Sequence, residues 1–366
     1  MKITRLVLLA GVAMLATLGV ALVTVASAAP GSAGDPVKGQ YIFAAAGGCG
    51  CHGINLAGYR AGGAPFGETF TGPFGSVPAL NITSDRNTGV GNWTDTQLIS
   101  AIRNGVDDGG NALFPIHPSS TLHFMSDADV ADLVAFLRTV PAVSNKVSDR
   151  QLNGPVPPAP PLPPSPPTSP ADGLARGRYL ATAVSDCGAC LTPTTPQGAP
   201  DMSKLLAGGV IPREGGTFEI GPNVTTDNAT GIGYWTQQDI VMYLKQGIGP
   251  NGRTADGLMG EVVAGGFGGL GLNQLTDADA AAIASFLKSI PAVSYVPKAP
   301  RAERGPMALA ASSWEAQFQA AHGRPPTAQD IADRNWALDF AARNGRPPSD
   351  VDWMAHWLQS QKGSSQ

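Results

Sequence analysis

Two cysteines and a histidine lie close together near the N-terminal end of the chain, at Cys49, Cys51 and His52. A cysteine pair followed directly by histidine is the signal by which a c-type haem is attached, through thioethers and one iron ligand. That signal is usually C-x-x-C-H, whereas this chain has C-x-C-H. Side chains two positions apart on an ideal helix diverge by about 200°, so Gly50 must relax the backbone if both thiols are to bind. Otherwise Cys51, which stays beside His52, is expected to form the only thioether.

A second cysteine pair, Cys187 and Cys190, has the full C-x-x-C spacing, but Leu191 follows it where histidine is required. The sequence contains no histidine between His123 and His322, so this region has no imidazole of its own. Cys187 and Cys190 are therefore expected either to tether a haem that lacks its proximal ligand or to belong to a domain that has lost the cofactor. Two such tight pairs do not join distant segments, so a disulfide framework is not predicted.

Both cysteine pairs belong to a longer sequence that occurs twice. Residues 81–105 align without a gap with residues 223–247, and residues 126–143 align with residues 276–293. Self-similarity of this length indicates two copies of one structural unit.

The same ungapped alignment places His117 of the first copy opposite Met259 of the second. Histidine and methionine can both coordinate iron, so His117 is a candidate for the second iron ligand of the first copy, and Met259 is a weaker candidate in the second. Met125, His123 and the lack of a strong sixth ligand stay open as alternatives. Two imidazoles donate more strongly than an imidazole and a thioether, which stabilises ferric iron and lowers the potential.

The elements that must position these residues are predicted to be helices. Thr94, Thr236, Ser126 and Thr276 each precede a helical pattern and can cap it. Few strand-like alternations occur, and Gly-rich segments join the helices, so the expected fold class is all-α.

Composition indicates what lies before, between and after the two copies. The chain has 366 residues with a net charge of −4, and it has no basic stripe that would bind nucleic acid. Residues 6–26 form an apolar run after Lys2 and Arg5, which predicts a secretory signal or an uncleaved anchor. A proline-rich stretch predicts a linker between the copies. A tryptophan-rich segment at 309–366, C-terminal to the second copy, predicts a small helical appendage.

This ordered set of motifs resembles the tandem di-haem c-type cytochromes that serve as subunits of membrane-associated alcohol, aldehyde and sugar-acid dehydrogenases. The residues that carry the resemblance are "GGCGCHG", "CGACLTP", "LAGG", both "N-[IV]-T-x-D-x-x-T-G" segments and both "D-A-D" helices. The resemblance implies the following organisation: a signal peptide or anchor at 1–28, a cytochrome c domain at 35–148, a linker at 149–171, a second, degenerate cytochrome c domain at 172–297, and the tail at 309–366.

The resemblance also implies the function. The expected role is an exported cytochrome that passes single electrons between a periplasmic dehydrogenase or small donor and a respiratory acceptor such as a terminal oxidase. Haem c is the expected cofactor, held by the first copy and doubtful in the second. A non-redox scaffold derived from a cytochrome fold is the alternative. Catalysis at an open haem is a third interpretation, which no acid, base or substrate pocket in the sequence favours.

Overall fold

The computed structural model describes residues 34–298 and a few positions of the tail. Residues within this range that are not described are 54–55, 57–68, 73, 158–160, 196–198, 213–217, 251 and 266; the described tail positions are 327–328, 331–332, 335–336, 339–340 and 343. The predicted N-terminal signal or anchor and nearly all of the predicted tail therefore lie outside the described residues. Among the described residues, no helix is long and apolar enough to cross a membrane.

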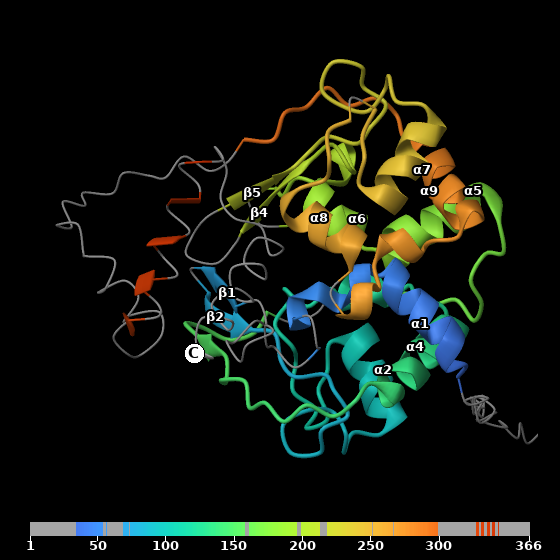
Figure 1. Ribbon diagram of the computed structural model, residues 1–366. Helices are drawn as coiled ribbons and strands as arrows, with labels where there is room; N and C mark the ends of the chain where they lie inside the picture. Colours follow the sequence, from blue (N-terminus) through green and yellow to red (C-terminus); the bar gives the residue numbers. More distant parts are fainter. Residues whose placement is uncertain are drawn as a thin grey trace, which may run out of the picture. The chain divides into compact units, whose positions relative to one another are not determined.

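The part of the chain before the proline-rich linker is called the first half, and the part after it the second half (Figure 1). The elements of the first half are α1 (Pro36–Ala45), η1 (Gly47–His52), β1 (Thr69–Gly72), β2 (Gly75–Pro78), α2 (Asp95–Asn104), α3 (Ser119–Leu122) and α4 (Asp127–Thr139). The linker region contributes β3 (Gln151–Leu152).

The second half repeats the helical elements of the first. Its elements are α5 (Gly173–Tyr179), the π-helical turn η2 (Leu180–Val184), α6 (Cys187–Leu191), η3 (Met202–Lys204), β4 (Gly209–Pro212), β5 (Phe218–Gly221), α7 (Gln237–Gln246), α8 (Gly257–Ala264), η5 (Phe267–Gly269), η6 (Leu272–Gln274) and α9 (Asp277–Ser289).

The predicted helix starts are confirmed, because each capping side chain makes its expected hydrogen bond. The Thr94 and Thr236 hydroxyls accept from the third residue of α2 and α7, and those residues return a bond to the cap. The Ser126 and Thr276 hydroxyls each accept a hydrogen bond from the backbone amide of the third residue of α4 and α9. Gly105 ends α2 in a left-handed conformation with φ 62°, where a residue with a Cβ would be strained.

A glycine lets the first helix of each half cross the last helix closely. A Cβ at Gly39 of α1 would lie 1.8 Å from the Asp132 carbonyl oxygen of α4. A Cβ at Gly177 of α5 would lie 1.9 Å from the Ala282 carbonyl oxygen of α9. Both distances are far below van der Waals contact, so these crossings depend on the absence of a side chain.

The all-α prediction is wrong, because each half also carries a small antiparallel sheet. Strands β1, β2 and β3 form one sheet in that order, and β4 pairs with β5 in the other. Four of these strands are only four residues long and one has two. Runs such as "TFTG" and "GSVP" are too short and too rich in glycine for an alternating pattern to be recognised in the sequence.

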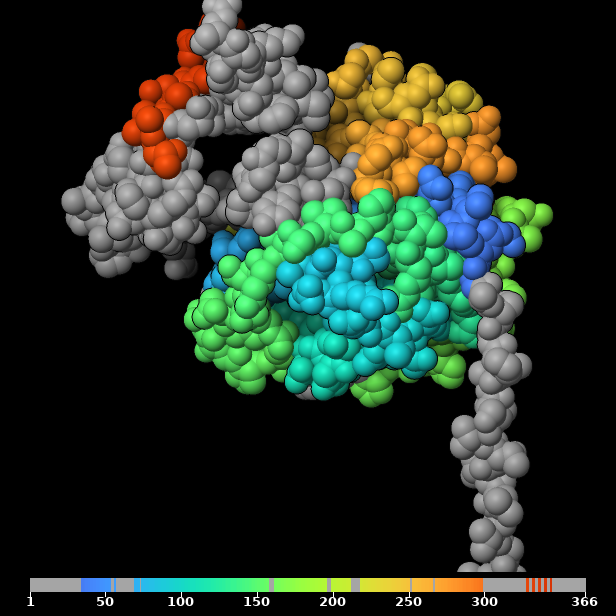
Figure 2. Space-filling model, turned by 60° about the horizontal axis from the view of Figure 1, so that its bottom comes forward, coloured from blue at the N-terminus to red at the C-terminus, as the bar shows by residue number. Residues whose placement is uncertain are grey.

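The two halves share one apolar core. The same cluster of buried side chains contains Phe43 and Met125 of the first half and Leu180 and Ile283 of the second. Polar contacts join the halves at the start of their last helices, since the Tyr41 hydroxyl bonds Asp279 and the Tyr179 hydroxyl bonds Asp129. The blue start of the first half and the orange end of the second meet in the space-filling view (Figure 2).

Candidate functional site

The C-x-C-H sequence forms a tight turn that begins in the left-handed region. Gly47, Gly48 and Cys49 have φ angles of 74°, 73° and 49° in succession. The two glycines adopt this conformation without steric cost, and Cys49 follows them. In the second half Asp186, with φ 46°, takes the left-handed position directly before Cys187. The shorter spacing of the first cysteine pair is thus accommodated in the backbone that precedes it.

The two cysteines of this turn have different surroundings. Cys49 packs against the shared core, and burial raises the pKa of its thiol to about 12. Cys51 is exposed. No disulfide joins any of the four cysteines, all of which lie among the described residues. Cys51 is the exposed cysteine beside His52.

His52 is held in an orientation that suits an iron ligand. Its Nδ1 lies 2.6 Å from the Leu80 carbonyl oxygen, which can only accept a hydrogen bond. Nδ1 therefore carries the proton, and the lone pair of Nε2 is left for a metal. Burial lowers the pKa of His52, so the ring is neutral, as a ligand must be.

His117 lies near His52 although the two are far apart in the sequence. Burial, with a smaller contribution from the nearby His52, lowers the pKa of His117 to about 4. Within the described part of the chain, the buried Nδ1 of His117 has no hydrogen-bond partner. A buried polar atom without a partner is costly, which indicates that the site accommodates a group that the protein atoms alone do not supply.

The two alternative ligands of the first half have different surroundings. Met125 is fully buried in the apolar core. The Nε2 of His123 lies 2.7 Å from the Pro163 carbonyl oxygen of the linker. Its buried Nδ1, like that of His117, has no hydrogen-bond partner in the described part of the chain. The structure thus places His117 near His52 and Met125 in the core, and His123 keeps one nitrogen that could bind iron.

The second cysteine pair lies on α6 without an imidazole. Burial, with a smaller contribution from the neighbouring carboxylate of Asp186, raises the pKa of the Cys187 thiol to about 12. Leu191, in the position of the missing histidine, packs against the apolar core, as does the partly buried Met259 on α8. Cys187, Cys190 and Met259 could accompany a haem there, but the described second half has no proximal histidine to hold its iron.

The first half provides a set of residues that fits haem c. It combines an exposed thiol, a neutral histidine with an available Nε2, and a second buried histidine with an unsatisfied nitrogen. The Leu80 carbonyl is a contributor that sequence reasoning missed, because a backbone acceptor leaves no signal in residue types.

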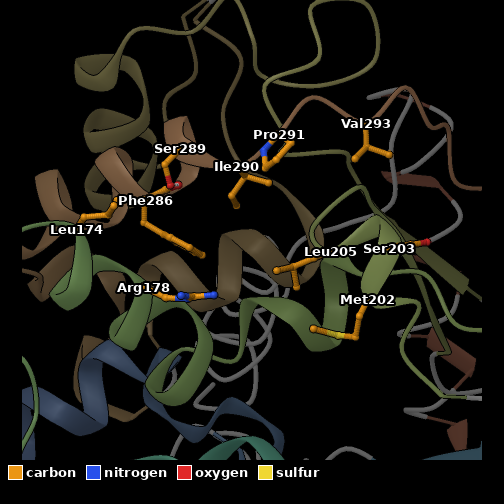
Figure 3. A pocket seen from close by; sticks show the side chains of 10 residues that line it. All are labelled: Leu174, Arg178, Met202, Ser203, Leu205, Phe286, Ser289, Ile290, Pro291 and Val293. Atoms are coloured by element: carbon orange, nitrogen blue, oxygen red, sulfur yellow. Dashed lines mark hydrogen bonds between the residues drawn. The ribbon is translucent and has the colours of Figure 1, made fainter.

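A separate groove lies on the second half, between α5, η3 and the end of α9 (Figure 3). Its volume is about 360 Å³, and Arg178 is the one charged residue among those that line it. No cysteine or histidine lines this groove, so it is not part of the candidate haem site.

Comparison with known proteins shows the family of this chain. A family model described as cytochrome c matches residues 36–141. A "diheme cytochrome c-type" protein of Cereibacter sphaeroides is 33% identical over 305 residues, which cover 76% of this chain and 98% of the relative. The cytochrome subunit of fructose dehydrogenase of Gluconobacter japonicus is 32% identical, covering 72% of this chain and 54% of the relative. The cytochrome c subunit of gluconate 2-dehydrogenase of Pantoea cypripedii is also 32% identical, covering 69% and 59%.

The chain therefore belongs to the cytochrome c family. It is an electron-transfer protein whose cofactor is haem c. It spans little more than half the length of the two dehydrogenase subunits, so their substrates and partners are not transferred to it by this comparison alone.

Proposed function

We propose that this chain carries single electrons from a dehydrogenase to a respiratory acceptor outside the cytoplasm, through one haem c bound by the first half. The observation that carries the proposal is the pairing of two neutral histidines: His52 with Nδ1 fixed on the Leu80 carbonyl, and nearby His117 with a buried, unpartnered Nδ1. Haem c, when bound, supplies an iron that exchanges one electron between its ferric and ferrous forms.

The residues of the first half have distinct roles in this proposal. Cys51 forms a thioether, and Cys49 forms a second one where the turn allows it. His52 is the proximal ligand through Nε2, because Nδ1 is occupied by the Leu80 carbonyl. His117 is the distal ligand. Two imidazole ligands favour the ferric state and give a lower potential than a histidine and methionine pair.

The second half is proposed to lack a functional haem. Leu191 occupies the place of the proximal ligand, and a leucine side chain cannot coordinate iron. Cys187, Cys190 and Met259 then act as ordinary side chains of a degenerate domain. The domain boundaries that we propose are 35–148 and 172–297, joined by the linker at 149–171.

The names of the relatives support the choice of partner. Two of them are cytochrome subunits of fructose dehydrogenase and gluconate 2-dehydrogenase. A dehydrogenase is therefore the proposed electron donor, and a terminal oxidase is the proposed acceptor. Export is inferred from the apolar run at 6–26, which either is cleaved or anchors the protein to the membrane.

Absorption spectroscopy and peptide mass spectrometry test the proposal. The full chain is produced in a host that is competent for cytochrome maturation, purified and reduced. We expect sharp α and Soret bands, a haem adduct on the peptide that contains Cys51, and none on the peptide that contains Cys187. A colourless protein would contradict haem binding altogether. An adduct on Cys187 alone would reverse the assignment of the site.

Cysteine variants resolve the attachment further. Cys51→Ser is expected to abolish covalent haem, whereas Cys49→Ser retains it if the exposed thiol alone bonds. Each thioether forms by addition of the S–H group across a vinyl double bond, so a cysteine that has not reacted keeps its thiol. Alkylation of the denatured holoprotein therefore reports which cysteine is unbonded.

A further inference from the structure

The second half packs directly on the backbone of the C-x-C-H turn. A Cβ at Gly47 would lie 3.2 Å from Cγ1 of Val262 on α8, so the Val262 methyl groups rest on the turn itself. Gly47 lies two residues before Cys49 and has a φ of 74°. Val262 therefore limits the positions that the turn can adopt.

The segment after α8 supports the helix that leads into the turn. The ring of Phe267 meets Phe43 edge-on, with ring centroids 6.4 Å apart and an interplanar angle of 88°. Phe43 is fully buried near the end of α1. Edge-to-face pairs of this kind add stabilisation beyond the apolar area that they bury. The approach to the turn is thus held by the second half as well.

The second half also contacts the loop that carries His117. The backbone amide of Ser126, which ends this loop, donates to the Tyr179 hydroxyl at 3.0 Å. The same hydroxyl donates to Oδ2 of Asp129 at 2.6 Å. Between His117 and Ser126, α3 packs against η2 of the second half, and Thr121 of α3 lies close to the Asp186 carboxylate. Tyr179 and Asp186 thus lie against this segment at two points after His117.

We propose that the second half is a clamp for the haem site of the first half, and that Val262, Tyr179 and Asp186 are positioning residues in it. The inference rests on the proposed ligands His52 and His117, which come from two segments whose separation must match an iron between them. A clamp that touches both segments sets that separation. It gives the second half a role that needs no haem of its own.

Hydrogen exchange tests the clamp without requiring haem. In Val262→Ala the amides of residues 44–53 should exchange faster by roughly fivefold or more, because a local opening loses its support. Val263→Ala is the matched control, since Val263 is the next residue of α8, is 6% exposed and faces Gly247 of its own half. It should leave exchange at 44–53 unchanged. Equal exchange in both variants, or a larger effect in Val263→Ala, would overturn the clamp.

Cyanide binding to the purified ferric protein tests the other side of the clamp. Asp186→Ala should loosen the His117 loop, so that cyanide displaces the distal ligand with an affinity roughly fivefold higher or more. Asp256→Ala, which removes an exposed carboxylate of the same half, is the control and should bind cyanide like the wild type. Unchanged affinity in Asp186→Ala would overturn this part of the proposal. A wild-type protein without haem would refute the proposed function, while the exchange experiment would still decide the clamp.

Discussion

The Tyr41 hydroxyl of the first half lies 2.6 Å from Oδ2 of Asp279 in the second half. Asp279 also receives two hydrogen bonds from Arg176. The relationship recurs in the opposite direction, where Tyr179 of the second half donates to Asp129 of the first at the same distance of 2.6 Å. Each half thus places a tyrosine at the start of the other half's last helix.

Removing both hydroxyls should weaken the contact between the halves. In Tyr41→Phe/Tyr179→Phe each carboxylate loses a phenol donor, and the free energy of unfolding should fall by about 1–3 kcal/mol for each bond. Urea unfolding at pH 7 measures the loss. Tyr234→Phe is the control, because Tyr234 is 60% exposed and should be nearly neutral. Loss of equal size in the control would contradict a specific role for the two hydroxyls.

The same tyrosines should make the protein sensitive to alkali. Burial is the main cause that raises the pKa of both Tyr41 and Tyr179, and the bonds to Asp279 and Asp129 raise it further. A folded-state pKa above the unfolded value gives stability that is present below about pH 10 and is lost as the pH rises through the folded pKa. The wild type should therefore lose more stability than Tyr41→Phe/Tyr179→Phe between pH 8 and pH 11. Parallel losses in urea unfolding would argue against this linkage.

Asp186 should make the free energy of unfolding depend on pH between about pH 4 and pH 7. Burial raises its pKa to about 6, against the smaller lowering effect of the nearby Thr121 side chain and Ala189 amide. Because the folded-state pKa exceeds the unfolded value, the stabilisation is present below about pH 4 and is lost as the pH rises through about 6. Relative to Asp186→Asn, the wild type should lose up to about 3 kcal/mol between pH 4 and pH 7. Denaturant unfolding checks this, with the exposed Asp256→Asn as control; a constant difference between wild type and Asp186→Asn would contradict it.

Much of this structure could be predicted from local chemistry. The caps at Thr94, Thr236, Ser126 and Thr276 each depend on one side chain and the amides that follow it, so the sequence alone predicted four helix starts. The strands could not be predicted in this way, because a run such as Gly209–Pro212 becomes a strand only through its partner Phe218–Gly221.

The candidate site also combines residues that have a signal in the sequence with contacts that have none. The types and spacing of Cys51 and His52 predicted a haem motif, and the repeat predicted His117. The Leu80 carbonyl that orients His52 is a backbone group and has no signature in the sequence. Tyr41 and Tyr179 occupy matching places in "KGQYI" and "RGRYL". Their contacts across the halves depend on how the halves pack, which no local pattern contains.

Restoring the missing imidazole should test why the second half lacks haem. Leu191→His converts "CGACL" into the full C-x-x-C-H signal. If the proximal ligand is what is absent, a second covalent haem should appear on the peptide with Cys187 and Cys190. Leu191→Ala removes the same side chain without adding a ligand and should not gain haem. A haem content that stays constant in Leu191→His would show that this half has lost more than its histidine.

Replacing the distal histidine should change the redox potential in a defined direction. In His117→Met a thioether takes the place of an imidazole, which donates less to ferric iron. The midpoint potential should therefore rise, by an amount on the order of 0.1 V within the span of about 0.8 V that axial ligands cover. His123→Met is the matched control, since His123 is engaged with the Pro163 carbonyl, and its potential should stay near that of the wild type. Redox titration of the α band measures both. Only replacement of an axial ligand is expected to change the potential in this way. A shift seen in His123→Met alone would therefore identify His123, and not His117, as the distal ligand.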